Sequence, residues 1–238
     1  MADRTAAPPD VSDGISLENI ILQFALMSAI FYLWSSPLIQ PVKIMVVLFH
    51  EMSHGLMAIL TGGNVLSIWI SPDEGGACET EGGMPLLVVS AGYLGSMFFG
   101  GMILYLSRFR VFVPMVFGLL ALMVIAAIVT VLEESFSRSF AAVLAGTFIF
   151  MGFLAPTFLA SFVLRVIGTV SCLYSIFDIY WDILAERGNQ IVQNDAVVFA
   201  RLSGISPEMV GMAWLVASVV FFLFVLRQML KVTPEETG

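Results

Sequence analysis

The feature that most constrains this chain is a series of apolar stretches, each close to the length of a membrane-spanning helix. A helix needs about 20 apolar residues to cross the roughly 30 Å hydrocarbon layer, since each residue rises about 1.5 Å. Hydrophobic residues make up 59% of the 238 positions, more than a soluble domain of this size can bury. We therefore predict an all-α polytopic integral membrane protein with six or seven transmembrane helices. The predicted spans are 20–36, 42–60, 85–106, 111–132, 139–161, 163–183 and 210–230.

The count of six or seven depends on the long apolar region at 139–183. Pro156 and Arg165 indicate a break there, because proline interrupts helical hydrogen bonding and a charge disfavours the bilayer centre. The chain then forms a single transmembrane domain at 19–231. A disordered N-terminal tail at 1–18, rich in charge and proline, precedes this domain, and a C-terminal tail at 232–238 follows it.

The charges of the chain indicate its surroundings. The formal net charge of −8 argues against nucleic acid as a partner, because binding to phosphates requires clustered Lys and Arg. With seven spans, six of the ten Lys and Arg residues fall on the side of the C-terminus. The positive-inside rule then predicts a cytosolic C-terminus and an outward N-terminus. We expect the lipid bilayer as the environment, with the plasma (inner) membrane as the location.

Two polar stretches interrupt the spans. In the first, Gly62 and Gly63 can end a helix, and the β-branched and aromatic segment 65–70 follows before Ser71 and Pro72. This predicts a short strand or hairpin at the membrane surface. The second stretch, 186–208, predicts a loop with a short helix from Asp195 onward, capped by the Asp195 side chain.

The second predicted span contains an HExxH motif, formed by His50, Glu51 and His54. On a helix the two histidines lie one turn apart on the same face, so both can direct a ring nitrogen at one Zn²⁺. Glu51 then lies beside the water on the metal. The alternative is that these are isolated polar residues buried in a helix bundle. However, ionisable groups cost about 2.5 to 3.5 kcal/mol each within a bilayer, which favours a functional site.

Two histidines leave a catalytic zinc one ligand short, because such sites typically combine three protein ligands with water. Asp178 and Asp182 share one face of an apolar span, and Glu133 and Glu134 lie at a helix end. If the second and sixth spans run in the same direction, His54 and Asp178 both lie about 18 to 20 Å along their helices. We therefore predict His50, His54 and Asp178 as zinc ligands, with Asp182 as the alternative third ligand.

At these residues the chain resembles the site-2 proteases, intramembrane zinc metallopeptidases, and in particular their compact peptidase-like branch without a PDZ domain. The resemblance covers roughly 42–200 and rests on four features: the motif at 50–54, Thr61-Gly62-Gly63 before the strand-like segment, Ala91-Gly92-Tyr93-Leu94-Gly95 at the next span, and Asp178. It implies that His50, His54 and Asp178 bind zinc and that Glu51 activates water. Typical members carry the third ligand in a Leu-Asp-Gly segment, whereas here it lies in Phe177-Asp178-Ile179.

The predicted function is that of an intramembrane zinc metalloprotease, a zinc metalloendopeptidase that hydrolyses peptide bonds of transmembrane protein substrates. Glu51 would take the proton of the attacking water and pass it to the leaving amine. The segment 65–70 could offer a strand edge to the extended substrate. The alternative is a catalytically inactive metal-binding scaffold or chaperone, or a metal transporter. Glu51 favours catalysis, because a transport site needs ligands but no base beside them.

Overall fold

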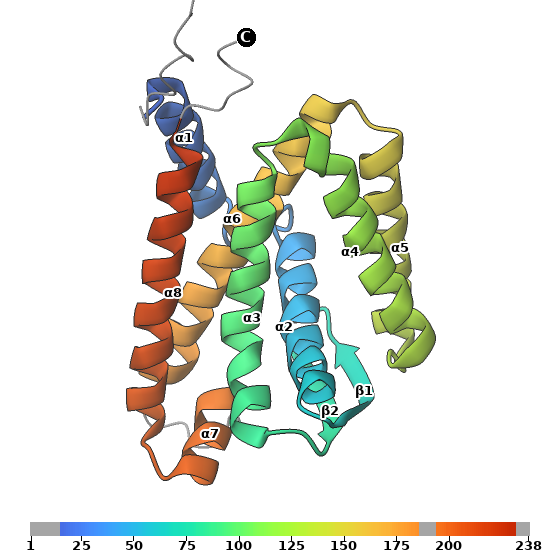
Figure 1. Cartoon of the computed structure of the whole chain (residues 1–238), viewed down its shortest axis with the longest axis vertical. Helices are drawn as coiled ribbons and strands as arrows, with labels where there is room; N and C mark the ends of the chain where they lie inside the picture. Colours follow the sequence, from blue (N-terminus) through green and yellow to red (C-terminus); the bar gives the residue numbers. More distant parts are fainter. Residues whose placement is uncertain (1–14, 186–193, 232–238) are drawn as a thin grey trace, which may run out of the picture.

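The computed structural model describes residues 15–185 and 194–231, which are mostly helical (Figure 1). A 3-10 turn, Arg110–Phe112, precedes the fourth helix, and a π-helical segment, Ile179–Ala185, extends the sixth. The two strands pair as one antiparallel hairpin, which confirms the predicted fold class. The elements in chain order are α1 (Leu17–Tyr32), α2 (Gln40–Leu60), β1 (Asn64–Ile70), β2 (Gly76–Glu81), α3 (Pro85–Leu106), α4 (Val113–Thr130), α5 (Ser135–Phe153), α6 (Thr157–Asp178), α7 (Asp195–Ser203) and α8 (Pro207–Met229).

Six helices in the described part of the chain are long and apolar enough to cross a membrane. The first helix, α1, is apolar but has 16 residues, which corresponds to about 24 Å and is shorter than the hydrocarbon layer. The chain is therefore an integral, multi-pass membrane protein with the lower of the two predicted span counts. The six candidate spans are Gln40–Leu60, Pro85–Leu106, Arg110–Thr130, Ser135–Phe153, Thr157–Trp181 and Pro207–Met229.

Prolines determine where several of these helices begin. A proline stands in the first turn of α2, α3, α4 and α8, where its fixed φ suits the helix and its missing N–H costs no bond. Pro156 is the residue before α6, which confirms the predicted break at this proline. Arg165 lies inside α6 instead of at the break. Asp178 is the last residue of α6, about 32 Å from its start at Thr157, so it lies farther along its helix than predicted but beside the same pocket as His50, as expected.

The two ends of the described chain lie on the same side of the bundle. The Ser16 N–H donates to the Leu230 carbonyl at 2.8 Å, and the Asn19 amide donates to the Lys231 carbonyl at 3.3 Å. An odd number of crossings would separate these residues by the thickness of the membrane. The predicted opposite placement of the two termini is therefore wrong, because α1 returns to the end of α8 instead of adding a seventh span.

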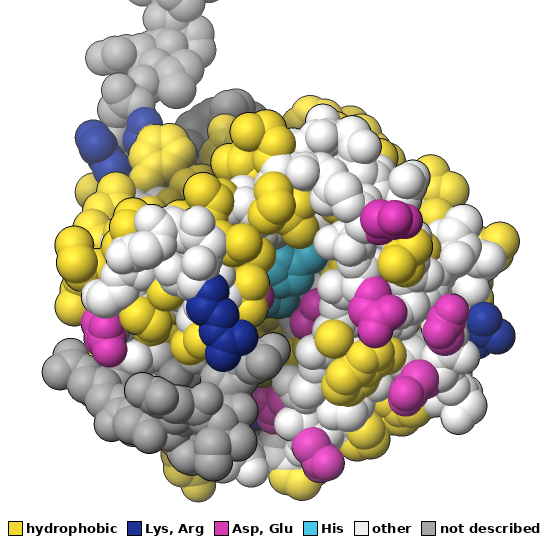
Figure 2. All heavy atoms as spheres, turned by 90° about the horizontal axis from the view of Figure 1, so that it is seen from below, with side chains coloured by type: hydrophobic (Ala, Val, Ile, Leu, Met, Phe, Trp, Pro, Cys, Tyr) yellow, Lys and Arg dark blue, Asp and Glu magenta, His cyan; other side chains and the backbone are white. Residues whose placement is uncertain are grey.

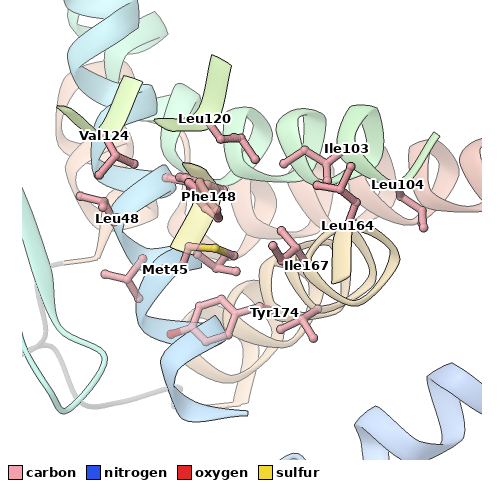
Figure 3. Close-up of a cluster of buried hydrophobic side chains, with 14 of the residues drawn as sticks. Met45, Leu48, Ile103, Leu104, Leu120, Val124, Phe148, Leu164, Ile167 and Tyr174 are labelled. Atoms are coloured by element: carbon pink, nitrogen blue, oxygen red, sulfur yellow. The ribbon is translucent and has the colours of Figure 1, made fainter. Parts of the chain in front are cut away.

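The hydrophobic core lies between α2, α3, α4, α5 and α6 (Figure 3). Met45 and Leu48 of α2 and Phe148 of α5 are among its buried side chains. Small residues allow α3 and α6 to approach closely, since a Cβ added at Gly168 would lie 2.7 Å from the Gly100 carbonyl oxygen. Such contacts are typical of helix packing in membranes. No hydrophobic driving force acts between helices in lipid, so they associate through close van der Waals packing at small residues. This packing holds α2, α3 and α6 around the site described below.

The hairpin lies along α2, and its two edges differ. The Ile68 N–H donates to the Val131 carbonyl at 2.9 Å. Ser137 bonds to both backbone groups of Ile70, accepting from the N–H at 2.9 Å and donating to the carbonyl at 3.2 Å. The outer edge of β1 is therefore occupied by the turn between α4 and α5 and by the first turn of α5. In the part of the chain that the structure describes, no strand pairs with the outer edge of β2.

Candidate metal centre

The HExxH motif lies in the second half of α2, and its two histidine rings meet edge to face with centroids 4.8 Å apart. The Nδ1 atom of His54 lies 2.7 Å from the Val88 carbonyl oxygen. A carbonyl can only accept a hydrogen bond, so Nδ1 carries the proton and donates it. In the neutral ring the lone pair is then on Nε2, which is the tautomer that a metal ligand requires. The Val88 carbonyl of α3 thus fixes the orientation of the His54 ring through its Nδ1 atom.

Asp195 approaches the two histidines from α7. Its Oδ2 atom lies 3.0 Å from His50 Nε2 and 3.2 Å from His54 Nε2. The three atoms belong to one group that could hold a metal ion, with all members within 4.8 Å of one another. Ligand atoms 2.0 to 2.2 Å from a tetrahedral zinc lie about 3.3 to 3.6 Å apart, close to the two measured separations. The donor set therefore fits zinc, and the two separations from Asp195 are close to those of ligands on one ion.

The local sequence explains why Asp195 is directed into the site. The side chain of Asn194 accepts the Val197 N–H at 3.0 Å and is the N-cap of α7. The prediction that Asp195 caps this helix is therefore wrong. Asp195 is the first helical residue, so its carboxylate is free of the capping role and points at the histidines. An anionic side chain in this first turn is also favoured by the helix dipole.

Electrostatics keep the Asp195 carboxylate ionised. Burial alone would raise its pKa, but in the metal-free protein with both imidazole rings protonated, the charges of His54 and His50 and their hydrogen bonds outweigh burial and hold the pKa well below its usual value. An ionised carboxylate is the form that binds a metal cation.

Glu51 lies beside these ligands and is 7% exposed. The backbone at the start of β2 passes close to its carboxylate, since a Cβ added at Gly76 would lie 2.8 Å from Glu51 Oε1. Both residues line a pocket of about 250 Å³ that also includes His50 and Asp195. Figure 2 shows histidine side chains in a hollow on the face that carries α7. The pocket is large enough to admit water, which a hydrolytic reaction requires.

The thiol of Cys78 on β2 does not add a nucleophile to this pocket. Burial, followed by the charge of Glu51, raises its pKa to about 12. It is therefore a neutral thiol at physiological pH.

Gly92 of α3 leaves the space into which the two histidine rings project. A Cβ added there would lie 2.3 Å from His50 Nε2 and 2.5 Å from His54 Nε2. The neighbouring Tyr93 is buried and packs edge-on against the His50 ring, with centroids 4.8 Å apart. Gly92, Ser96 and Gly100 recur every four residues of α3, a spacing typical of closely packed helices. At Gly92 the closely packed neighbours are the side chains of His50 and His54 in the HExxH motif.

Replacing Gly92 by alanine is expected to weaken zinc binding about 10- to 100-fold or more, because the methyl group displaces both metal-binding nitrogens. Helix stability should not fall, since alanine is the better helix former by about 1 kcal/mol. Metal titration of the purified protein measures the effect. Gly146→Ala is the matched control, since a Cβ at Gly146 meets nothing within 4 Å. Equal zinc affinity in the two variants would show that Gly92 does not shape the site.

The sequence offered four other acids as candidates for the third ligand. Asp178 lines the same pocket but is outside the group of three metal-binding atoms. The side chain of Asp182 lies outside the described part of the structure. Glu133 and Glu134 are exposed at the turn between α4 and α5 and do not line this pocket. Among the described residues, the carboxylate that meets both histidines is thus Asp195.

Sequence reasoning missed Asp195 because it lies in a polar stretch, whereas the candidates for the third ligand were acids within apolar spans or at the end of one. One signal could have found it. Asn194 and Asp195 are both good N-cap residues, and a single helix needs only one.

A comparison with protein families decides the relationship that the motif suggested. The model of the family described as Peptidase M50B-like matches residues 23–225, which is most of the chain. This chain belongs to the site-2 protease family. Searches of curated proteins and of solved structures found no match. The match includes the HExxH helix, the hairpin and α7, so His50, His54 and Asp195 all lie within the family region. The predicted recognition is therefore confirmed, and no PDZ domain interrupts the described residues.

Proposed function

We propose that this site-2 protease family member is an intramembrane zinc metalloprotease that cleaves membrane-spanning protein substrates. The observation that carries the proposal is the convergence of His50 Nε2, His54 Nε2 and Asp195 Oδ2 beside the buried carboxylate of Glu51. These side chains come from α2, a candidate span, and from α7, which joins the candidate spans α6 and α8. A metal transporter or an inactive scaffold would need the ligands but not the adjacent base.

Each side chain then has a distinct role. His50, His54 and Asp195 would hold the zinc ion. When bound, zinc would polarise the scissile carbonyl and make a water molecule acidic enough to lose a proton near neutral pH. Glu51 would accept this proton and later transfer it to the amine of the leaving peptide. The Val88 carbonyl would keep His54 in the required tautomer through the bond to Nδ1.

The substrate must reach this site in an extended form, because the carbonyls of an intact helix are engaged in hydrogen bonds. The sequence suggested that segment 65–70 provides a strand edge. However, Val131 and Ser137 already occupy the outer edge of β1. We therefore propose that the extended substrate pairs with β2, whose first residue, Gly76, contacts Glu51. A trapped substrate that leaves the β2 amides unprotected in hydrogen exchange would argue against this pairing.

Metal removal tests the proposed function. The purified protein in detergent or vesicles should contain zinc and cleave a model single-span substrate. Incubation with a chelator should abolish cleavage, and added Zn²⁺ should restore it, because the ion supplies the charge that stabilises the transition state. Mass spectrometry of the products measures cleavage, and metal analysis measures the zinc.

The possible outcomes separate the candidate functions. Zinc without cleavage of any single-span substrate would favour the inactive scaffold, whereas a protein that never binds zinc would contradict the proposal altogether. The plasma (inner) membrane as the location and the cytosolic C-terminus stay predictions.

A further inference from the structure

The turn that joins β1 to β2 holds a residue in an unfavourable backbone conformation. Glu74 has φ of +66°, and it is the one non-glycine residue with positive φ among those that the structure describes. Side chains with a Cβ rarely adopt this left-handed region, and glutamate is not among the residues enriched there. A glycine would fit the turn without strain but would lack the side-chain carboxylate, so the contacts of the Glu74 carboxylate distinguish it from a glycine at this position.

That side chain forms an ion pair with α2. The Lys43 Nζ atom lies 2.6 Å from Glu74 Oε1, and the two side chains are only 12% and 24% exposed. The Lys43 ammonium also lies over the Trp34 ring, 5.4 Å from its centroid. A second tie joins the same elements, since the Gln40 amide donates to the Pro72 carbonyl at 3.0 Å. The turn of the hairpin is therefore fastened to the beginning of a candidate membrane span.

The same turn leads directly into the catalytic pocket. Glu74, Gly75 and Gly76 all line the pocket that contains His50 and Glu51. Gly76, the first residue of β2, follows Glu74 by two positions, and its backbone lies against the Glu51 carboxylate. Lys43 and Glu51 are both on α2, eight positions apart, so they are held at a fixed distance by the helix. The ion pair therefore helps to fix where β2 starts relative to Glu51, together with the pairing of β2 with β1.

We propose that Lys43 and Glu74 form a positioning pair that sets the register of β2 against Glu51 and so selects which substrate bond is cleaved. This inference rests on the proposed function, in which an extended substrate pairs with β2. Both residues act through the strand and not on the reacting atoms. Without the pair, the start of β2 can shift relative to Glu51, and a substrate paired with it shifts as well. Antiparallel pairing repeats every two residues, so the scissile position of the substrate is expected to move by two residues relative to Glu51.

Cleavage-site mapping tests the proposal. The zinc-loaded protein is incubated with a model single-span substrate, and the termini of the products are determined by mass spectrometry. The wild type should cut at one main position. Lys43→Met and Glu74→Gly should each produce a second product, displaced by two residues. Glu74→Gly also removes the backbone strain, which offsets part of the stability lost with the ion pair. The double variant Lys43→Glu/Glu74→Lys should return to the single main position.

The controls and contradicting outcomes are distinct. Arg110→Gln, which removes an exposed charge at the start of α4, should leave the cleavage position unchanged. One unchanged cleavage position in both Lys43→Met and Glu74→Gly would overturn the proposal. A charge-swap variant that cuts at both positions, as the single variants do, would equally overturn it.

A second measurement does not depend on proteolysis. If the wild type cleaves nothing, the proposed function fails, but the positioning role can still be judged by hydrogen exchange of the β2 amides, Gly76–Glu81. Exchange there should be faster in Lys43→Met and Glu74→Gly than in the wild type. Equal exchange rates in all three proteins would refute the role of the pair, whatever the outcome for function.

Discussion

Replacing Asp195 by asparagine is expected to remove zinc from the protein, whereas the same replacement at Asp178 should leave zinc bound. The Oδ2 atom of Asp195 lies 3.0 and 3.2 Å from the two histidine Nε2 atoms, so a bound ion would contact it. Asparagine keeps the size of the side chain but loses its charge. The loss of a residue beyond the direct ligands typically costs 10- to 100-fold in metal affinity, so the loss of a ligand should cost about 100-fold or more.

Metal analysis and zinc titration of both purified variants measure this difference. Asp178 is a well-matched comparison, because it is also an aspartate and lines the same pocket. The sequence by itself predicted the opposite result, with Asp178 as the third ligand. Zinc retained in Asp195→Asn and lost in Asp178→Asn would therefore restore the sequence-based ligand set. In that case the contact of Asp195 with the two histidines would be an ion pair and not part of a metal site.

Replacing Glu51 by glutamine is expected to abolish most cleavage while zinc remains bound. Glutamine has the shape of glutamate but cannot take up the proton of water, so the general-base contribution disappears. That contribution is typically 10²- to 10⁴-fold, which corresponds to about 2.7 to 5.4 kcal/mol of the activation barrier. Steady-state cleavage of the model substrate measures the loss, and metal analysis on the same sample verifies the zinc.

Glu133→Gln is the control for this experiment, because Glu133 is an exposed carboxylate at a helix end and does not line the pocket. Its activity should equal that of the wild type. Full activity in Glu51→Gln would exclude Glu51 as the base. Loss of both zinc and activity would instead indicate that Glu51 supports the metal.

Local patterns predicted much of this molecule correctly. The apolar runs identified the candidate spans, because crossing a hydrocarbon layer demands a fixed length of apolar helix whatever its neighbours are. Gly62, Gly63 and the β-branched segment predicted the hairpin, since the conformation of each residue there depends on its own side chain. His50, Glu51 and His54 were found because their relationship lies within one helix.

The errors share a different cause. The depth estimate placed Asp178 beside the pocket of His50, but the carboxylate that meets both histidines is Asp195, which α7 brings from the polar stretch between α6 and α8. The β1 edge was expected to be open, but the turn before α5 brings Ser137 to it from 67 positions away in the chain. Both points depend on where separate elements meet, which no local pattern records.

The sequence by itself determined the environment of this protein, its helical spans and the HExxH motif, with two histidines on one helix face and Glu51 beside them. The tertiary structure alone decided which carboxylate meets the histidines, which strand edge is open and which glycine leaves space beside the histidine rings. The reason is physical. Spans, turns and one-turn spacings follow from forces between residues close in the chain, whereas His50 and Asp195 are 145 positions apart and meet only because α2, α3, α6 and α7 pack together.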